Sequence, residues 1–204
     1  IDFANNIDLD EIKDELIKNK YLKKTKQVKP KNRKINLTKY ILNGNEIYCG
    51  KNNIQNDYIT HKLAKSYDWW FHVKDAPGSH VLFKVPTPNY ELTEQDIRYC
   101  ANLASCFSKT SISSSVPVDY LQIKYIKEIP GVKGSQVTYT NQKTIYIDPF
   151  RIKKDYKDAD YIFCTHSHYD HFSKEDIEKL LKADTIIITV QDAREDAIVL
   201  VEED

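Results

Sequence analysis

Residues able to bind a phosphate or stack on a nucleobase are concentrated between Gly50 and His80. This stretch reads GKNNIQNDYITHKLAKSYDWWFHVKDAPGSH and holds both tryptophans and three of the six histidines. Amide, lysine and aromatic side chains at such density are typical of a surface that touches RNA or a phosphorylated partner. For any single residue a packed strand with polar flanks is the favoured interpretation, but for the whole group we favour binding.

The candidates for this surface fall into two sets. Phosphate contacts are expected from Lys51, Asn52, Asn53, Asn56 and Lys62, because amide donors at the start of a helix suit a phosphate oxygen. The other candidates are Gln55, Asp57, Trp70, His72, Lys74, Asp75, Ser79 and His80. Two alternatives stay open: the amides only cap the helix, and the two aspartates orient lysines or simply fix turns.

A second group, THSHYDH at positions 165–171, has the types and spacing of metal ligands. Imidazole and carboxylate suit zinc, and a zinc-bound water becomes a nucleophile near neutral pH. The pattern lies between an expected strand and helix, and it resembles the metallo-β-lactamase superfamily over about residues 144–190. That resemblance implies that His166 and His168 hold one zinc, and that Asp170 and His171 hold a second.

The same segment departs from that superfamily downstream. No histidine follows His171, and only 33 residues remain, so the family's last histidines and bridging aspartate are missing. An incomplete ligand set makes hydrolysis an unfavoured prediction. Weak zinc binding at the histidine cluster remains an expectation.

Five short motifs in the first group carry a further resemblance. GKNN, QND, WFH, KD and PGSH occur in this order, which resembles the NFACT-R domain of NFACT-family proteins, bacterial ribosome quality-control factors also labelled fibronectin-binding proteins. The resemblance covers about residues 1–149. It implies an RNA-binding module acting on stalled large ribosomal subunits that carry peptidyl-tRNA, with tRNA and the large subunit as partners. It also implies no catalytic activity, no required cofactor and no small-molecule substrate.

Charge divides the chain into two parts. Residues 1–149 hold 22 basic and 16 acidic residues, a balance of +6, whereas residues 150–204 hold 8 and 14, a balance of −6. Any contact with nucleic acid is therefore expected in the first part. No apolar run approaches the length needed to cross a bilayer. The four cysteines lack disulfide or metal spacing, so we expect reduced thiols and a cytoplasmic location. The chain contains no Met and is interpreted as a fragment.

Local patterns predict an α+β fold with a mostly antiparallel sheet and flanking helices. Helices are expected at 8–22, 54–66, 93–108 and after residue 173. Strands are expected at 40–42, 47–49, 68–73, 80–85, 118–127, 137–139, 144–147 and 161–164. The strands on either side of Asn43-Gly44 should form a hairpin, and those at 137–139 and 144–147 should form a closing hairpin.

These elements suggest four parts. They are the end of a coiled-coil arm (1–22), a basic linker (23–38), an RNA-binding domain (39–149) and a truncated metallo-β-lactamase-like segment (150–204), a partial α/β unit expected to extend the sheet from Thr144. The leading hypothesis is a module that binds RNA or the ribosome. The alternatives are a zinc-dependent hydrolase and a protein-interaction scaffold.

Overall fold

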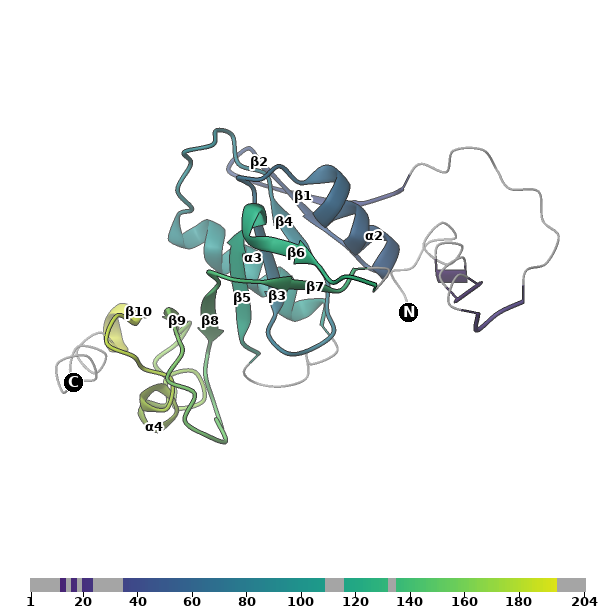
Figure 1. Ribbon diagram of the computed structural model, residues 1–204. Helices are drawn as coiled ribbons and strands as arrows, with labels where there is room; N and C mark the ends of the chain where they lie inside the picture. Colours follow the sequence, from purple (N-terminus) through teal and green to yellow (C-terminus); the bar gives the residue numbers. More distant parts are fainter. Residues whose placement is uncertain are drawn as a thin grey trace.

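One long β-sheet organises the chain, whose computed structural model describes residues 12–13, 16–17, 20–23, 35–108, 116–131 and 135–193 (Figure 1). Its strand order is β1-β2-β4-β3-β5-β8-β9-β10, and β6 and β7 form a separate two-stranded sheet. The strands are β1 Thr38–Leu42, β2 Asn45–Cys49, β3 Trp69–Val73, β4 Val81–Phe83, β5 Val118–Gln122, β6 Ile126–Glu128, β7 Val137–Tyr139, β8 Lys143–Ile147, β9 Tyr161–Phe163 and β10 Ile186–Ile188. The helices are α2 Asn53–Tyr58, the π-helix η1 Ile59–Leu63, α3 Glu94–Cys106, the 3-10 helix η2 Ile123–Tyr125, α4 Lys174–Glu178 and the 3-10 helix η3 Gln191–Ala193.

The predicted α+β class with a mostly antiparallel sheet is confirmed. All pairs from β1 to β8 are antiparallel, whereas β8-β9 and β9-β10 are parallel. The hairpin β1-β2 turns at Asn43 and Gly44, whose φ angles of 49° and 81° lie in the left-handed region. This region is the one that a two-residue type I′ turn requires, and Asn-Gly is its preferred pair.

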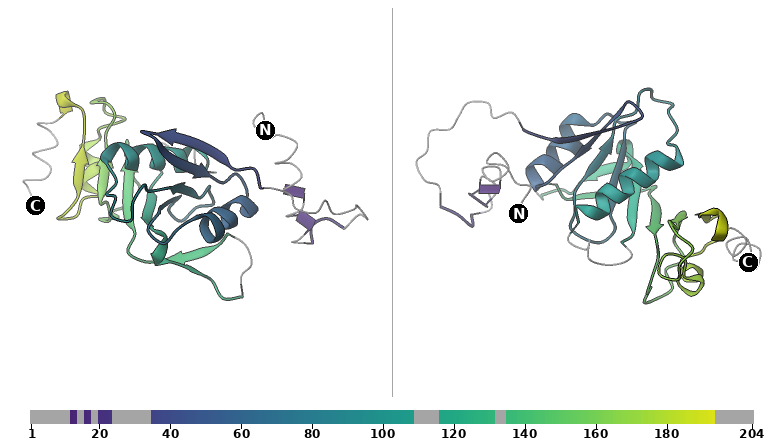
Figure 2. Two further views of the ribbon diagram at one scale, coloured as in Figure 1. Left: turned by 90° about the horizontal axis from the view of Figure 1, so that it is seen from above. Right: turned by 180° about the vertical axis from the view of Figure 1, so that it is seen from behind.

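Helix α3 covers one face of the sheet, as the view from behind in Figure 2 shows. Thr93 caps its first turn: its hydroxyl accepts a hydrogen bond from the Asp96 backbone, and the Asp96 carboxylate accepts one from the Thr93 backbone. This reciprocal pair is the predicted N-terminus. The helix buries Ile97, Cys100 and Ala104 against inward-facing residues of the central strands, and together these form the larger hydrophobic core.

The opposite face of the central strands is covered as well. There Tyr139 of β7 contacts Trp70 of β3 at 5.4 Å between ring centroids, and its hydroxyl donates a hydrogen bond to buried Asp119 of β5. From η1, Thr60 reaches His80 just before β4. With covers on both faces, neither Trp70 nor Phe71 is exposed.

Two predicted features of the region after β5 are wrong. The strand expected at 118–127 breaks at Ile123, because Ile123 N donates to Asp68 O and Lys124 N donates to Ser66 O. These bonds turn the chain out of the main sheet into η2 and then β6. Strand β7 therefore pairs with β6, and β8 pairs with β5 and β9 instead of forming the expected closing hairpin with β7.

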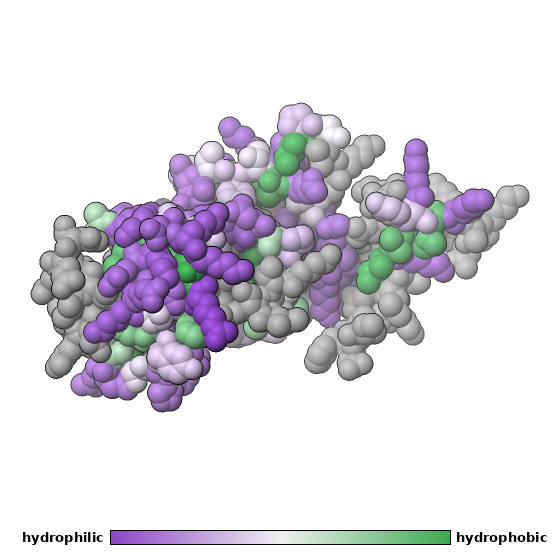
Figure 3. All heavy atoms as spheres, turned by 90° about the horizontal axis from the view of Figure 1, so that it is seen from below, coloured by the Kyte–Doolittle hydropathy of each residue, from purple (hydrophilic) through white to green (hydrophobic). Residues whose placement is uncertain are grey.

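The expected extension of the sheet beyond Thr144 is confirmed. Strands β9 and β10 add to β8 in parallel register, and α4 covers their outer face in a second hydrophobic cluster that contains Tyr146, Ile162 and Ile177. Hydrophilic side chains gather over this end of the molecule (Figure 3). The second cluster shares strand β8 with the larger core, because Ile145 belongs to one and Tyr146 to the other.

The predicted N-terminal arm lies largely outside the described residues. Residues 12–13 and 16–17 are helical, and most of the predicted linker at 23–38 is not described. Among the described residues, no helix has both the length and the apolar character needed to span a membrane.

Candidate nucleic-acid interface

The asparagine-rich loop begins α2 and holds its first turn closed. The Asn52 side chain accepts a hydrogen bond of 2.9 Å from Gln55 N, so Asn52 is the helix cap. Gln55 is buried, and its side chain accepts from Lys51 N at 2.9 Å and donates to Asn36 O at 3.1 Å. The capping interpretation, which the sequence left open, is confirmed for Asn52.

Asn56 joins α2 to the segment that carries PGSH. Its amide donates to Gly78 O at 3.2 Å, and its carbonyl oxygen accepts from His80 N at 3.0 Å. Gly50 N in turn donates to His80 O at 3.1 Å. Four of the quoted motif residues therefore meet through internal hydrogen bonds, which fix the loop and the turn against each other.

A cluster of rings lies beside this junction, with Trp70 and His80 buried and His72 half-buried. Trp70 stacks on His72 with ring centroids 5.3 Å apart, and His80 contacts both rings. His80 Nδ1 shares a hydrogen bond of 2.7 Å with Thr60. Burial lowers the pKa of His72, and burial together with the nearby histidines lowers the pKa of His80 well below its usual value. Both rings are therefore neutral at pH 7.

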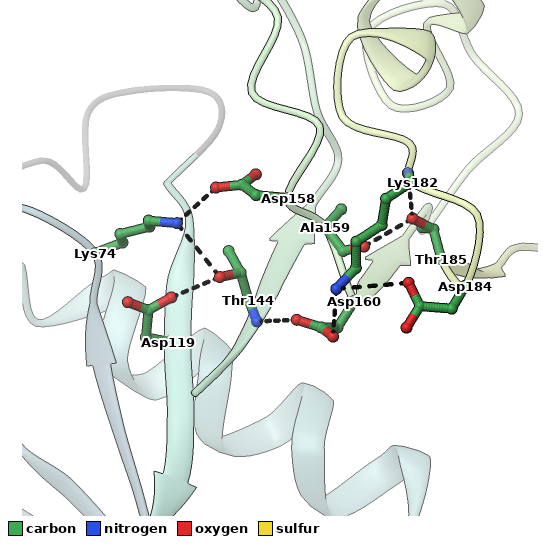
Figure 4. A network of polar contacts seen from close by, with 9 residues as sticks. All are labelled: Lys74, Asp119, Thr144, Asp158, Ala159, Asp160, Lys182, Asp184 and Thr185. Atoms are coloured by element: carbon green, nitrogen blue, oxygen red, sulfur yellow. Dashed lines mark hydrogen bonds and ion pairs between the residues drawn. The ribbon is translucent and has the colours of Figure 1, made fainter. Parts of the chain in front are cut away.

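Lys74 leaves β3 and enters a polar network with the C-terminal segment (Figure 4). Its ammonium lies 2.6 Å from Asp158 and 3.4 Å from Thr144 Oγ1, and Thr144 donates to buried Asp119. Burial lowers the pKa of Lys74, but the hydrogen bond to Asp158 and the charges of Asp119, Asp158 and Asp75 together outweigh it, so the net shift is upward. Lys74 therefore remains protonated, and its ammonium group is already paired with the Asp158 carboxylate.

Several candidates for the binding surface are buried, which corrects the expectation that they lie exposed. The amide and hydroxyl side chains among them are buried because they satisfy backbone groups, where an unpaired polar group would be costly. The rings among them are buried because they pack against one another. The buried candidates are Gln55, Asn56, Trp70, Ser79 and His80. Ser79, for example, donates to Phe107 O at 3.3 Å.

The remaining candidates keep some access to solvent. Lys51, Asn53, Lys62 and Asp75 are exposed, whereas Asn52, Asp57, His72 and Lys74 are half-buried. Their role in RNA binding stays a prediction. Asn53 Oδ1 also accepts a hydrogen bond of 2.9 Å from Ser135, which ties α2 to the segment before β7.

Sequence reasoning missed a basic surface at the other end of η1. Lys65 and Lys124 are far apart in the sequence, and the hydrogen bond from Lys124 N to Ser66 O brings their backbones together. No local pattern signals this pair, because it depends on the break after β5. Only a prediction of where that strand ends would have found it.

The predicted metal ligands lie at the end of β9. The imidazole centroids of His166 and His171 are 4.8 Å apart, and His171 Nδ1 lies 2.9 Å from Asp148, which raises the pKa of His171. His166, His168 and Asp170 are exposed. In the described part of the chain, no three His, Cys, Asp or Glu residues are arranged to hold a metal ion. Zinc binding here stays a prediction.

The sequence matches the family described as NFACT protein RNA binding domain over residues 40–148. The Rqc2 homolog RqcH of Bacillus subtilis (strain 168) is 41% identical over 150 residues, covering 72% of this chain and 26% of that protein. The Rqc2 homolog RqcH of Streptococcus suis (strain 05ZYH33) is 38% identical over 148 residues, with the same coverage of 72% and 26%. The chain thus spans about a quarter of the length of these curated relatives.

A solved structure is also similar. It is described as the C-terminal of the fibronectin/fibrinogen-binding protein from Streptococcus suis, with a TM-score of 0.63 at 38% identity, and the match covers 73% of this chain and 60% of that one. The family match ends at residue 148, so the resemblance of 144–190 to metallo-β-lactamases gains no support from it.

Proposed function

This chain belongs to the NFACT family, in its RNA-binding domain, and we propose that it is the RNA-binding module of a ribosome quality-control factor. The module acts on stalled large ribosomal subunits that carry peptidyl-tRNA, and its partners are tRNA and the large subunit. One observation carries this proposal: the family match runs from β1 to β8 and therefore contains all five motifs.

The exposed lysines of this domain supply the means of binding. Lys51 and Lys62 lie on and beside the α2-η1 segment with their side chains in solvent. Phosphates on RNA attract such ammonium groups, and the release of condensed counterions makes the binding depend on salt. The internal hydrogen bonds of Asn56 give this segment a fixed shape, so that little ordering is needed when RNA binds.

We further propose that the module works by binding alone, in the cytoplasm and without a cofactor. Two of the three histidines in residues 39–149, His72 and His80, are packed against Trp70, and burial lowers the pKa of both. Treatment with a chelator should leave RNA binding unchanged. A chelator-sensitive hydrolytic activity with stoichiometric zinc would contradict this part of the proposal.

A binding titration tests the main proposal. Labelled tRNA and purified large ribosomal subunits are titrated with the whole chain at about 50 mM and about 200 mM salt, a range over which several phosphate contacts weaken binding steeply. Binding that falls with salt is the expected result. An absence of binding at the lower salt would overturn the proposal.

A pair of matched variants locates the contact. The double variant Lys51→Gln, Lys62→Gln removes two positive charges from the α2-η1 segment and should weaken binding severalfold. The control Lys153→Gln, Lys154→Gln removes the same charge from exposed positions in the C-terminal segment and should bind like the parent. Equal weakening in both variants would mean that total charge, not this segment, determines binding.

A further inference from the structure

We propose that the end of the domain formed by η1, the loop after it and η2 is an RNA site that grips a single strand through lysines and stacks bases on tyrosines. This inference rests on the proposed function and adds to it a location and a kind of RNA. The surface is called the lysine–tyrosine patch and consists of Lys62, Lys65, Tyr67, Lys124, Tyr125 and Lys127. No residue of it except Lys62 is among the sequence-derived candidates.

The four exposed lysines of this patch come from two distant parts of the chain. Lys62 and Lys65 come from η1 and the following loop, whereas Lys124 and Lys127 come from η2 and β6. The backbone bond from Lys124 N to Ser66 O, at 2.9 Å, joins the two parts. On the other side, His61 of η1 lies 3.6 Å from Glu128 of β6, so the helix and the strand are neighbours.

The lysines of the patch are available to bind an anionic ligand. Among the described residues, none of these four lysines forms an ion pair, whereas Lys74 and Lys84 each contact a carboxylate. Two acidic side chains lie near the patch: Glu128, which is exposed and faces His61, and Asp68, which is buried and paired with Lys84. With four exposed ammonium groups and one exposed carboxylate, the surface of the patch has a positive excess that favours a polyanion.

Tyrosines alternate with these lysines. The Lys65 ammonium lies 5.6 Å from the Tyr67 ring centroid, and the Lys124 ammonium lies 5.0 Å from that of Tyr125. Both rings are half-buried, so each keeps part of its surface in solvent. Stacking of bases on aromatic rings within a positively charged surface is how proteins hold single strands without reading their sequence.

The side chains of Asp68 and Lys84 hold the loop that carries Lys65 and Tyr67 in place. Asp68 is fully buried, and its carboxylate accepts hydrogen bonds from Lys65 N at 2.8 Å and Val85 N at 3.2 Å and pairs with the Lys84 ammonium. Lys84 also donates to Leu63 O at 3.2 Å. These bonds fix both ends of the loop, so the positions of Lys65 and Tyr67 are set before any ligand arrives.

A single-stranded RNA fits this combination better than a double helix or an acidic protein. A duplex hides its base faces and would leave the tyrosines unused. An acidic peptide offers charge but has no planar groups for the rings. The ligand class is therefore unpaired RNA, such as a loop or a free end.

The test uses the whole chain and a fluorescein-labelled oligouridine of about 12 nucleotides, long enough to cover a site of this kind. The double variant Lys65→Gln, Lys124→Gln should raise the dissociation constant about tenfold at low salt. Each lost phosphate contact should reduce the slope of log affinity against log salt by about 0.7, so the expected reduction is about 1.4. The control Lys153→Gln, Lys154→Gln should match the parent in both values.

A second variant separates stacking from charge. Tyr125→Leu should weaken oligouridine binding about fivefold or more while leaving the salt slope unchanged, since one lost stacked base costs about 1 kcal/mol or more. Parent-like binding by both patch variants would overturn the patch and leave the proposed function standing. Failure of the parent itself to bind tRNA, large subunits and oligouridine would overturn both. Equally tight binding of oligoglutamate would show a general anion surface and overturn the assignment to RNA.

Discussion

Replacing Gly50 with alanine tests whether the motif residues act as an internal brace. A Cβ on Gly50 would lie 2.2 Å from Asn56 Oδ1 and 3.0 Å from Asn56 N. The methyl group must therefore push the carboxamide away. That displacement breaks the bond from His80 N, a buried donor, and the bond to Gly78 O.

Two effects of opposite sign decide the outcome. Alanine restricts the unfolded chain more than glycine does, which alone stabilises a protein by about 0.4–1 kcal/mol. Against this, overpacking costs about 1–3 kcal/mol, and a buried N–H left without an acceptor costs about 1–3 kcal/mol more. We expect Gly50→Ala to lower the free energy of unfolding by about 3 kcal/mol. For a chain of this size the melting temperature should fall by about 6–12 °C.

Thermal unfolding followed by circular dichroism measures this effect, and two further variants isolate its cause. Gly44→Ala is the control, because a Cβ added to Gly44 would have nothing within 4 Å of it. This variant should lose only the free energy associated with its φ of 81°, about 1–2 kcal/mol. Adding Asn56→Ala to Gly50→Ala removes the colliding side chain. The double variant should therefore lose less unfolding free energy than the sum of the losses in the two single variants. A Gly50→Ala protein as stable as the parent would refute the brace.

Two other predictions concern buried side chains that can carry a charge. Burial lowers the pKa of His72 and His80, so each binds a proton more readily in the unfolded chain, where the pKa is about 6.5. Their contribution is present above that value and is lost as the pH falls below it, so the urea midpoint should drop between pH 7 and pH 5. It should drop less in His72→Gln, His80→Gln; identical pH profiles would contradict this origin. Asp68→Ala leaves the Lys84 ammonium, whose side chain is 19% exposed, without its carboxylate, and should cost about 3–5 kcal/mol in urea unfolding. A midpoint like the parent's would show that the pair adds nothing.

Local signals predicted the elements that they determine. The Asn43-Gly44 turn and the Thr93-Asp96 cap each depend on residues within four positions, and both formed as expected. The strand expected at 118–127 failed because its end is set by Ser66 and Asp68, which lie more than 50 positions earlier. β-branched and aromatic residues continue past Gln122, so the sequence itself gives no sign of the break.

The candidate site shows the same division between local and distant causes. The sequence identified which residues cluster, and Gly50, Asn56, Gly78 and His80 do meet. It did not predict their burial, because polar and aromatic side chains in a motif look alike whether they face a ligand or one another. The lysine–tyrosine patch around Lys65 and Lys124 was not predicted, because its residues are distant in the sequence and belong to no shared motif.

The sharing of β8 between two hydrophobic clusters bears on how this protein can be produced in parts. The family match stops at residue 148, which makes that position a natural place to end a recombinant fragment. Such a fragment would uncover Tyr146, which is 1% exposed, and leave the edge of β8 that now pairs with β9 open. An unpaired, apolar strand edge invites other chains to add to it. Aggregation of a 35–148 fragment would therefore report the loss of its neighbouring strands and not a failure of the RNA-binding domain to fold.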